Sequence, residues 1–397
     1  MKIQIFADAF HGYLGDKTSS PIFGGQEILL LETCKLLLEQ GNEVQVVQLS
    51  NINAKLTFEG IEIVKIKSPD LLLLQKFGFI KRWTWAGILF VKHIDKNADW
   101  IHLHNHHFSF PMTFFKSKKQ VMTGMNHGVE WDVPWVYSVT SLKSLRDRFS
   151  FFLLKMVTNF SVKHLDKIIT NDRFFIHFTT LFKPHLADKF KYIPNYYDER
   201  VFNKDIKLNI DNHLISDLIS FRGNRKLVLL PKMSMRDRGT DILIEAVSKS
   251  SSWCLVITGV SSSQKEYVDY VLANNLKDKV FFTGHIDYKV TLPFVYKLSD
   301  IVVIPSPCRE ATAIALLEAL AMCKPVISSE IGGLVEIIHD KYNGILVLPN
   351  AANFKEKIEY LLVNDETAKE YATNGCLTVQ KRFNRSIWHE NMINFFK

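Results

Sequence analysis

Length, composition and charge limit what this chain can be. Its 397 residues are 47% hydrophobic and 23% charged, which is enough apolar material for more than one core and excludes a disordered chain. The formal net charge of +8 is compatible with nucleic acid, anionic lipid or a phosphate-bearing substrate as a partner, and five cysteines without CxxC spacing predict neither a zinc knuckle nor a disulfide framework.

The first half of the chain alternates short apolar runs with helical patterns. A strand at Ile3–Ala7 is followed by helical periodicity over Glu27–Gln40, which Gly41 closes. Further strands are predicted at Glu43–Leu49, Ile61–Ile66, Trp100–Leu103, Gln120–Met125, Asp166–Thr170 and Lys191–Ile193. Strands separated by helices predict parallel βαβ units in a doubly wound α/β sheet.

The alternation starts again near residue 200. Strands are predicted at Lys226–Leu230, Cys254–Thr258, Val280–Thr283, Ile301–Ile304, Pro325–Ser328 and Gly344–Val347. The polar stretch Asn195–Asn224 is the expected crossover, and Tyr371–Phe396 has the pattern of one helix. We therefore predict two Rossmann-like domains, at 1–197 and from 198 to 375, with a ligand cleft between their sheet edges.

The segment Ile301–Gly333 carries the strongest chemical signal. A buried strand ends in a Pro-Ser-Pro turn, the loop after it carries Glu310, and the helix that follows contains Glu318. Glu310 thus lies at the carboxyl end of a parallel strand and at a helix N-terminus, where sheets expose groups that contact ligands. The alternative is structural, with Glu310 as a capping acid and Glu318 as a carboxylate on the helix surface.

Glu310 and Glu318 resemble the E-x7-E pattern of the retaining glycosyltransferases of the family 4 type, also called glycosyl transferases group 1. The match extends to Lys324-Pro325-Val326-Ile327 and to Gly332-Gly333. The resemblance implies that Glu310 contacts hydroxyls of the donor sugar and that Glu318 accepts hydrogen bonds from the ribose of the nucleotide.

The loop between the two glutamates departs from the family pattern. Where the family usually has a Gly-Phe-Gly-like run, this chain has Ala311-Thr312-Ala313, followed by Ile314. Glycines there let backbone amides approach sugar and phosphate closely, and alanine can do so only if φ stays negative. By resemblance we still place all four residues, Ala311 to Ile314, at the donor.

The stretch Leu227–Ala246 resembles the family's diphosphate-binding loop. Lys232 and Arg238 take the positions of its two cations, with each cation type exchanged. Fixed cations can stabilise the charge that develops on a departing diphosphate. The alternative is a solvated basic loop. Because no Asp-x-Asp motif follows a strand, we expect no metal and no cofactor beyond the nucleotide sugar itself.

Other positions are assigned by the same resemblance. Gly24-Gly25, before the first helix, resembles the family's glycine loop, and His127 resembles the histidine that positions the donor sugar. Gly259 and Ile286 match turns at the donor site. Nearby histidines compete with His127 for this role and are a weaker candidate for a metal site: His102, His104, His106 and His107.

The resemblance implies a GT-B fold in which a C-terminal helix, 376–397, packs back on the first domain. The expected function is transfer of a hexose from a nucleotide-diphosphate sugar to a glycan or lipid-linked glycan, with retention of configuration. The alternatives are a sugar-nucleotide epimerase of the same fold and a degenerate protein that binds nucleotide sugar without turnover.

Two basic, aromatic segments bear on where the chain acts. Phe77–His93 and Ser141–His164 interleave lysine and arginine with aromatic residues, which is typical of helices that lie on a membrane surface and also of ordinary packed helices. We expect a cytoplasmic protein, and these two segments add an anionic inner membrane surface as the further partner to test. The chain has no nucleic-acid recognition motif, so we expect no nucleic-acid partner.

Overall fold

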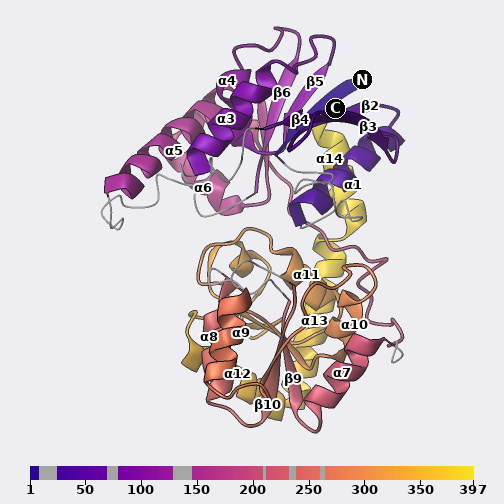
Figure 1. Cartoon of the computed structure of the whole chain (residues 1–397), viewed down its shortest axis with the longest axis vertical. Helices are drawn as coiled ribbons and strands as arrows, with labels where there is room; N and C mark the ends of the chain where they lie inside the picture. The colour runs from indigo at the N-terminus through magenta and orange to yellow at the C-terminus, as the bar shows by residue number, and fades with distance from the viewer. Residues whose placement is uncertain (9–24, 69–78, 128–144, 209–211, 232–237, 260–263) are drawn as a thin grey trace. The chain divides into compact units, whose positions relative to one another are not determined.

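The computed structural model describes the chain except for residues 9–24, 69–78, 128–144, 209–211, 232–237 and 260–263. The chain forms two compact units: unit 1 comprises Met1–Ile193 and His389–Lys397, and unit 2 comprises Pro194–Trp388. Each unit is built on its own, mainly parallel sheet with helices packed against it (Figure 1). The predicted α/β fold class is confirmed.

Unit 1 has an eight-stranded sheet in the order β3-β4-β2-β1-β5-β6-β7-β8. Only β3 and β4 pair antiparallel. The strands are β1 Lys2–Ala7, β2 Glu43–Ser50, β3 Ala54–Phe58, β4 Ile61–Lys67, β5 Trp100–Leu103, β6 Val121–Asn126, β7 Lys167–Thr170 and β8 Phe190–Tyr192. The helices that cover it include α1 Gly25–Glu39, α3 Phe79–Val91, α4 Ser109–Met112, α5 Leu145–His164 and α6 Arg173–Phe182. The sequence analysis missed β3, a short edge strand without a fully buried residue.

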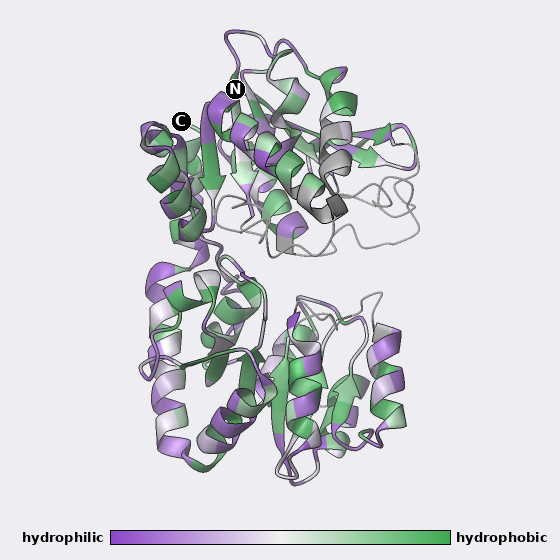
Figure 2. Ribbon diagram, turned by 90° about the vertical axis from the view of Figure 1, so that its left-hand side faces the viewer, coloured by the Kyte–Doolittle hydropathy of each residue, from purple (hydrophilic) through white to green (hydrophobic). Residues whose placement is uncertain are grey.

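Unit 2 has a six-stranded, fully parallel sheet in the order β11-β10-β9-β12-β13-β14. The strands are β9 Lys226–Leu230, β10 Trp253–Ile257, β11 Val280–Phe282, β12 Ile301–Ile304, β13 Val326–Ser329 and β14 Ile345–Val347. The helices are α7 His213–Arg222, α8 Thr240–Ser248, α9 Gln264–Ala273, α10 Leu292–Leu298, α11 Ile314–Ala321, α12 Ala351–Val363 and α13 Asp365–Arg382. Two apolar clusters, one on each face, bury the central strands, which are largely green in Figure 2.

The C-terminal segment differs from its prediction. The single helix expected over Tyr371–Phe396 is two helices, α13 and α14 (Arg385–Phe395), with a break at Phe383. Val379 and Phe383 lie in the core of unit 2, so residues 376–388 belong to that unit. The part that packs on unit 1 begins at His389, later than the predicted residue 376.

The contacts of residues 389–397 explain why they belong to unit 1. In unit 1, His389 Nε2 lies 2.7 Å from a carboxylate oxygen of Glu32, and Phe396 packs on Trp100. The predicted crossover, Asn195–Asn224, is also part of unit 2, because α7 within it buries Ile215 and Leu218 in the same core.

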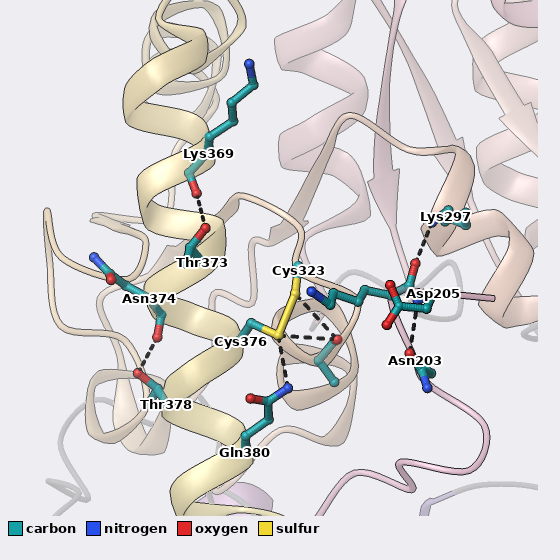
Figure 3. Close-up of a disulfide and its surroundings, with 12 residues drawn as sticks. Asn203, Asp205, Lys297, Cys323, Lys369, Thr373, Asn374, Cys376, Thr378 and Gln380 are labelled. Carbon is teal, nitrogen blue, oxygen red and sulfur yellow. Dashed lines mark hydrogen bonds between the residues drawn. A yellow bond between two sulfur atoms is a disulfide. The ribbon is translucent and has the colours of Figure 1, made fainter.

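A disulfide joins Cys323 and Cys376 within unit 2 (Figure 3). Cys323 follows α11 and Cys376 lies on α13, with a separation of 53 residues and 5.1 Å between the two Cα atoms. The sequence predicted no disulfide framework, and this single disulfide was not foreseen. Spacing along the chain could not reveal this pair, because it depends on the packing of α13 against α11.

Candidate functional site

The order of the strands in unit 2 reverses between β9 and β12. The chain moves outward from β9 through β10 to β11 and then crosses back to β12. In open parallel sheets, ligands bind at the carboxyl ends of the strands beside such a reversal. The segment after β9 carries Arg238 and the segment after β12 carries Glu310. Two predicted site residues therefore come from the two strands that flank this point.

Arg238 and Glu310 are in contact. Arg238 Nη1 lies 3.3 Å from Glu310 Oε1, and the hydroxyl of Ser306 donates a hydrogen bond to the same oxygen. The Glu310 side chain is 10% exposed and that of Arg238 is 37% exposed. A guanidinium has five N–H donors, so Arg238 can hold Glu310 and still receive an anion from solvent. Lys232, the other predicted cation, lies outside the described residues.

A glycine pair supports the Glu310 loop. The Gly333 N–H donates to the Glu310 carbonyl over 2.6 Å, and a Cβ on Gly332 would lie 2.5 Å from that carbonyl oxygen. Gly332 also has φ +54°, which favours glycine. From the other side, Asn195 Nδ2 donates to the carbonyl of Thr312 over 2.6 Å. The glycine pair therefore acts through close backbone packing against the loop.

The run Ala311–Ala313 keeps the backbone conformation that alanine requires. The positive-φ residues other than glycine in the described part of the chain lie elsewhere, and Ala313 has φ −69° as the N-cap of α11. All three residues are buried. Because alanine has no side-chain oxygen with which to cap a helix, an anionic ligand can take that place at the first turn, which begins at Ile314.

Two tyrosines that the sequence analysis missed hold Glu318. Tyr288 donates a hydrogen bond to Glu318 Oε1 over 2.6 Å, and Tyr296 donates to Oε2 over 2.8 Å. Glu318 is only 2% exposed. Burial raises the pKa of its carboxyl to about 7, although the two hydrogen bonds act in the opposite direction. The carboxyl group is thus positioned and desolvated without a ligand.

The rings of both tyrosines are fixed by packing. Phe202 meets Tyr288 and Tyr296 edge-on, with centroid distances of 5.3 and 5.7 Å. A buried glutamate needs donors, but the sequence does not say which ones. In the sequence, the one indication that Tyr288 lies near Glu318 was its position, two residues after the predicted donor-site turn at Ile286.

The turns predicted at the donor site lie side by side. Gly259, shortly after β10, has φ +78° and donates its N–H to the carbonyl of Gly284 over 3.0 Å. Gly284 follows β11, and Ile286 is half-buried against the core of unit 2. The two turns therefore form one edge at the carboxyl ends of β10 and β11, next to the Glu318 tyrosines.

In unit 1, His127 follows β6 and has a defined hydrogen bond. Its Nε2 lies 2.7 Å from the carbonyl oxygen of His104, to which it must donate. Burial lowers the pKa of His127, while the bond to His104 raises it by a smaller amount. In the neutral ring Nδ1 then carries no proton and can accept a hydrogen bond.

His104 connects this histidine to the first helix. Its ring packs edge-on against His127 with 4.6 Å between centroids, and its Nε2 lies 3.2 Å from the carbonyl of Gln26. Gly25 is the first residue of α1, so the predicted glycine position is next to this contact. Gly24 lies outside the described residues.

The remaining histidines of this region are buried. His102 contacts the hydroxyl of Thr123 and His107 that of Thr158. Burial lowers the pKa of both His102 and His106 to about 3. Within the described ranges, no group of three His, Cys, Asp or Glu side chains is placed to hold a metal.

Comparisons with known proteins show what the chain is similar to. Residues 216–377 match the family model described as Glycosyl transferases group 1. The uncharacterized glycosyltransferase MJ1178 of Methanocaldococcus jannaschii is 32% identical over 205 residues, which are 51% of this chain and 56% of that protein. The chain spans about half the length of the curated relatives it matches.

Two solved structures share the fold of the whole chain. Sucrose-phosphate synthase of Thermosynechococcus elongatus aligns with a TM-score of 0.76 at 20% identity, over 100% of this chain and 98% of that one. HepE of Anabaena, solved with UDP and glucose, aligns with a TM-score of 0.72 at 16% identity, over 100% and 99%. Arg238, Glu310 and Glu318, which are predicted donor-site residues, lie inside the matched segment 216–377. Residues 216–377 are therefore similar to the glycosyl transferases group 1, and the chain shares the GT-B fold of these solved structures.

Proposed function

We propose that the chain is a retaining glycosyltransferase that acts at the cytoplasmic side of a membrane. It would move a hexose from a nucleotide-diphosphate sugar to a glycan or lipid-linked glycan during synthesis of a cell-surface polysaccharide or glycoconjugate. The observation that carries the proposal is the contact between Arg238 and Glu310 at the reversal of the unit 2 sheet. It brings a cation for the diphosphate and a carboxylate for the sugar together.

The chemistry follows from the charge that moves. The bond between the anomeric carbon and the diphosphate oxygen breaks, and a bond from that carbon to an acceptor oxygen forms on the same face. The acceptor proton passes to the departing diphosphate. Negative charge therefore grows on the diphosphate, where Arg238, with Lys232, would stabilise the transition state in place of a metal. Glu310 would accept hydrogen bonds from sugar hydroxyls.

Glu318 supplies the ribose contact in this proposal. Each carboxylate oxygen has two acceptor sites, so ribose hydroxyls can bind while Tyr288 and Tyr296 remain in place. The tyrosines then act as positioning residues. In unit 1, Nδ1 of His127 would accept a hydrogen bond from a hydroxyl of the sugar or acceptor, which makes His127 a positioning residue as well.

The experiment is a donor panel. Purified protein is incubated with UDP-, GDP-, ADP- and dTDP-sugars in EDTA, and thermal shift and nucleotide release are recorded. UDP-glucose is the first donor to try, because HepE was solved with UDP and glucose. We expect one donor to stabilise the protein and to release nucleotide slowly, and Glu318→Ala and Lys232→Ala to abolish both effects.

The same panel separates the alternatives. Conversion of a nucleotide sugar to its epimer without an acceptor would identify an epimerase. Binding without turnover, even when glycan and lipid-linked acceptors are added, would identify a binding protein. Turnover that appears only when Mg²⁺ replaces EDTA would contradict the metal-independent reaction.

A further inference from the structure

Helix α5 in unit 1 carries apolar residues on its exposed side. Phe149, Phe152 and Met156 are 61%, 55% and 53% exposed. At 100° per residue, their spacing of three and four places them on one narrow stripe. A helix on the surface of a globular domain normally has polar residues there. The stripe therefore has the composition of a buried face in an exposed position.

Neighbouring elements extend this apolar surface. Helices α3, α4 and α5 pack against one another, as Figure 1 shows. Phe114, which follows α4, is exposed and packs against Phe160 of α5 with 5.4 Å between ring centroids. At the end of α6, Leu181 and Phe182 are also exposed. Apolar side chains from three segments thus contribute to one region of unit 1.

Lysines lie beside the apolar stripe. Lys155 and Lys163 are exposed on α5, and Lys183 directly follows Phe182 at the end of α6. The charges of Lys163 and Lys155 both reach Lys183, whose pKa is lowered first by burial and then by these two charges. Like charges at such distances repel, and an anionic partner would remove this cost.

We propose that Phe149, Phe152, Met156, Lys155, Lys163 and Lys183 form a docking surface for an anionic lipid bilayer, named here the α5 surface. Exposed aromatic and aliphatic side chains insert at the boundary of headgroups and acyl chains, while lysines contact anionic headgroups. No helix in the described part of the chain is long and apolar enough to cross a bilayer, so this contact is peripheral. The inference deepens the part of the proposed function that places the protein at a membrane, and it requires no particular donor or acceptor.

Vesicle flotation tests the proposal on the whole 397-residue chain. Vesicles of phosphatidylcholine alone are compared with vesicles that contain phosphatidylglycerol as well, at low and high NaCl. We expect the protein to float only with the anionic vesicles and to be released by salt. The triple variant K155Q/K163Q/K183Q should lower partitioning on the order of a hundredfold, since each lysine near an anionic surface contributes about a factor of ten or less.

A second variant, F149S/F152S/M156S, tests the apolar stripe and should lower partitioning by roughly tenfold or more. Matched controls in unit 2 are L272S/L348S/V363S and K265Q/K277Q/K369Q, which change exposed residues of the same kind and should leave partitioning unchanged. Circular dichroism and donor-induced thermal shift establish that each variant folds. Donor binding in a protein that does not float separates failure of this proposal from failure of the proposed function.

Three results would overturn the proposal. The first is no flotation of the wild-type protein with anionic vesicles. The second is equal loss in the unit 2 controls. The third is conversion of a dimer to a monomer by F149S/F152S/M156S in sedimentation velocity with no change in flotation, which would identify the stripe as a contact between copies of the chain.

Discussion

The ends of the two sheets carry different chemistry. In unit 2 the residues after β12 include Glu310, which is paired with Arg238, and α11 carries Glu318, which is hydrogen-bonded to two tyrosines. In unit 1 the residues after β5 and β6 are His104 and His127, whose ring nitrogens contact backbone carbonyls. Burial lowers the pKa of both histidines, so both are neutral near pH 7. The groups named in unit 2 are a cation and two carboxyl groups, whereas the two histidines named in unit 1 are neutral rings with the carboxylate of Asp8 near His127.

This difference indicates which ligand group each unit can hold. A diphosphate needs fixed positive charge and a ribose needs carboxylate acceptors, and unit 2 has both. Neutral imidazoles suit uncharged hydroxyls, because they can accept or donate without holding a charge in a buried place. Variants in unit 2 should therefore disturb nucleotide recognition, and variants in unit 1 should disturb only sugar or acceptor positioning.

The largest expected effect comes from Arg238→Gln. Loss of the cation should lower kcat by roughly 10²–10³-fold, because the charge that it would stabilise develops mainly in the transition state. Steady-state kinetics with the best donor give the value. Lys249→Gln is the control, since Lys249 lies exposed on the surface and pairs with Glu245. Equal activity of the Arg238 variant and this control would remove Arg238 from the mechanism.

The next effect concerns the pH dependence of nucleotide binding. Burial raises the pKa of Glu318 to about 7, so the free protein must lose this proton before both oxygens can accept from ribose. As pH rises toward 7, the Kd for nucleotide should fall about tenfold per pH unit, and above pH 7 it should level off. Titration calorimetry between pH 5.5 and 8.5 measures this, and Glu318→Gln should abolish the slope. Tyr296→Phe removes a bond that favours the carboxylate and should shift the midpoint upward.

A smaller effect is expected for His127→Gln. Loss of one hydrogen bond to a hydroxyl should lower kcat/KM by about five- to tenfold and leave the Kd for nucleotide unchanged. If this variant weakened nucleotide binding as much as the variants of unit 2 do, the proposed division of roles between the two units would be wrong.

The smallest effect is on stability without ligand. The folded protein holds the Glu318 proton more tightly than the unfolded chain, whose carboxyl titrates near ~4.3. The stability that this proton adds to the folded protein is fully present below the pKa of the unfolded chain and is lost as pH rises through about 7. Thermal unfolding should thus show a downward slope in stability between pH 5 and 7 that is absent in Glu318→Gln. If the variant kept the same slope, groups other than Glu318 would cause it.

The sequence revealed those features that depend on local pattern. Alternating strands and helices predicted both sheets, and the pattern around Glu310, Glu318 and Arg238 predicted residues of which the structure brings Glu310 and Arg238 into contact. Tyr288 and Tyr296 were missed, as was the pairing of Cys323 with Cys376, because each depends on which helices and turns pack together. The segment boundary near residue 376 was also misplaced, since only the core shows that Phe383 belongs to unit 2.

The most direct test of the account is the affinity for the nucleotide diphosphate of the donor, measured by calorimetry with EDTA and then with Mg²⁺. We expect the same Kd for the wild-type protein in both conditions. In Arg238→Gln the Kd should rise by roughly tenfold or more, because a charge-assisted contact is lost, and in Lys249→Gln it should not change. Binding that requires Mg²⁺, or an unchanged Kd in Arg238→Gln, would contradict the claim that the basic loop of unit 2 recognises the diphosphate.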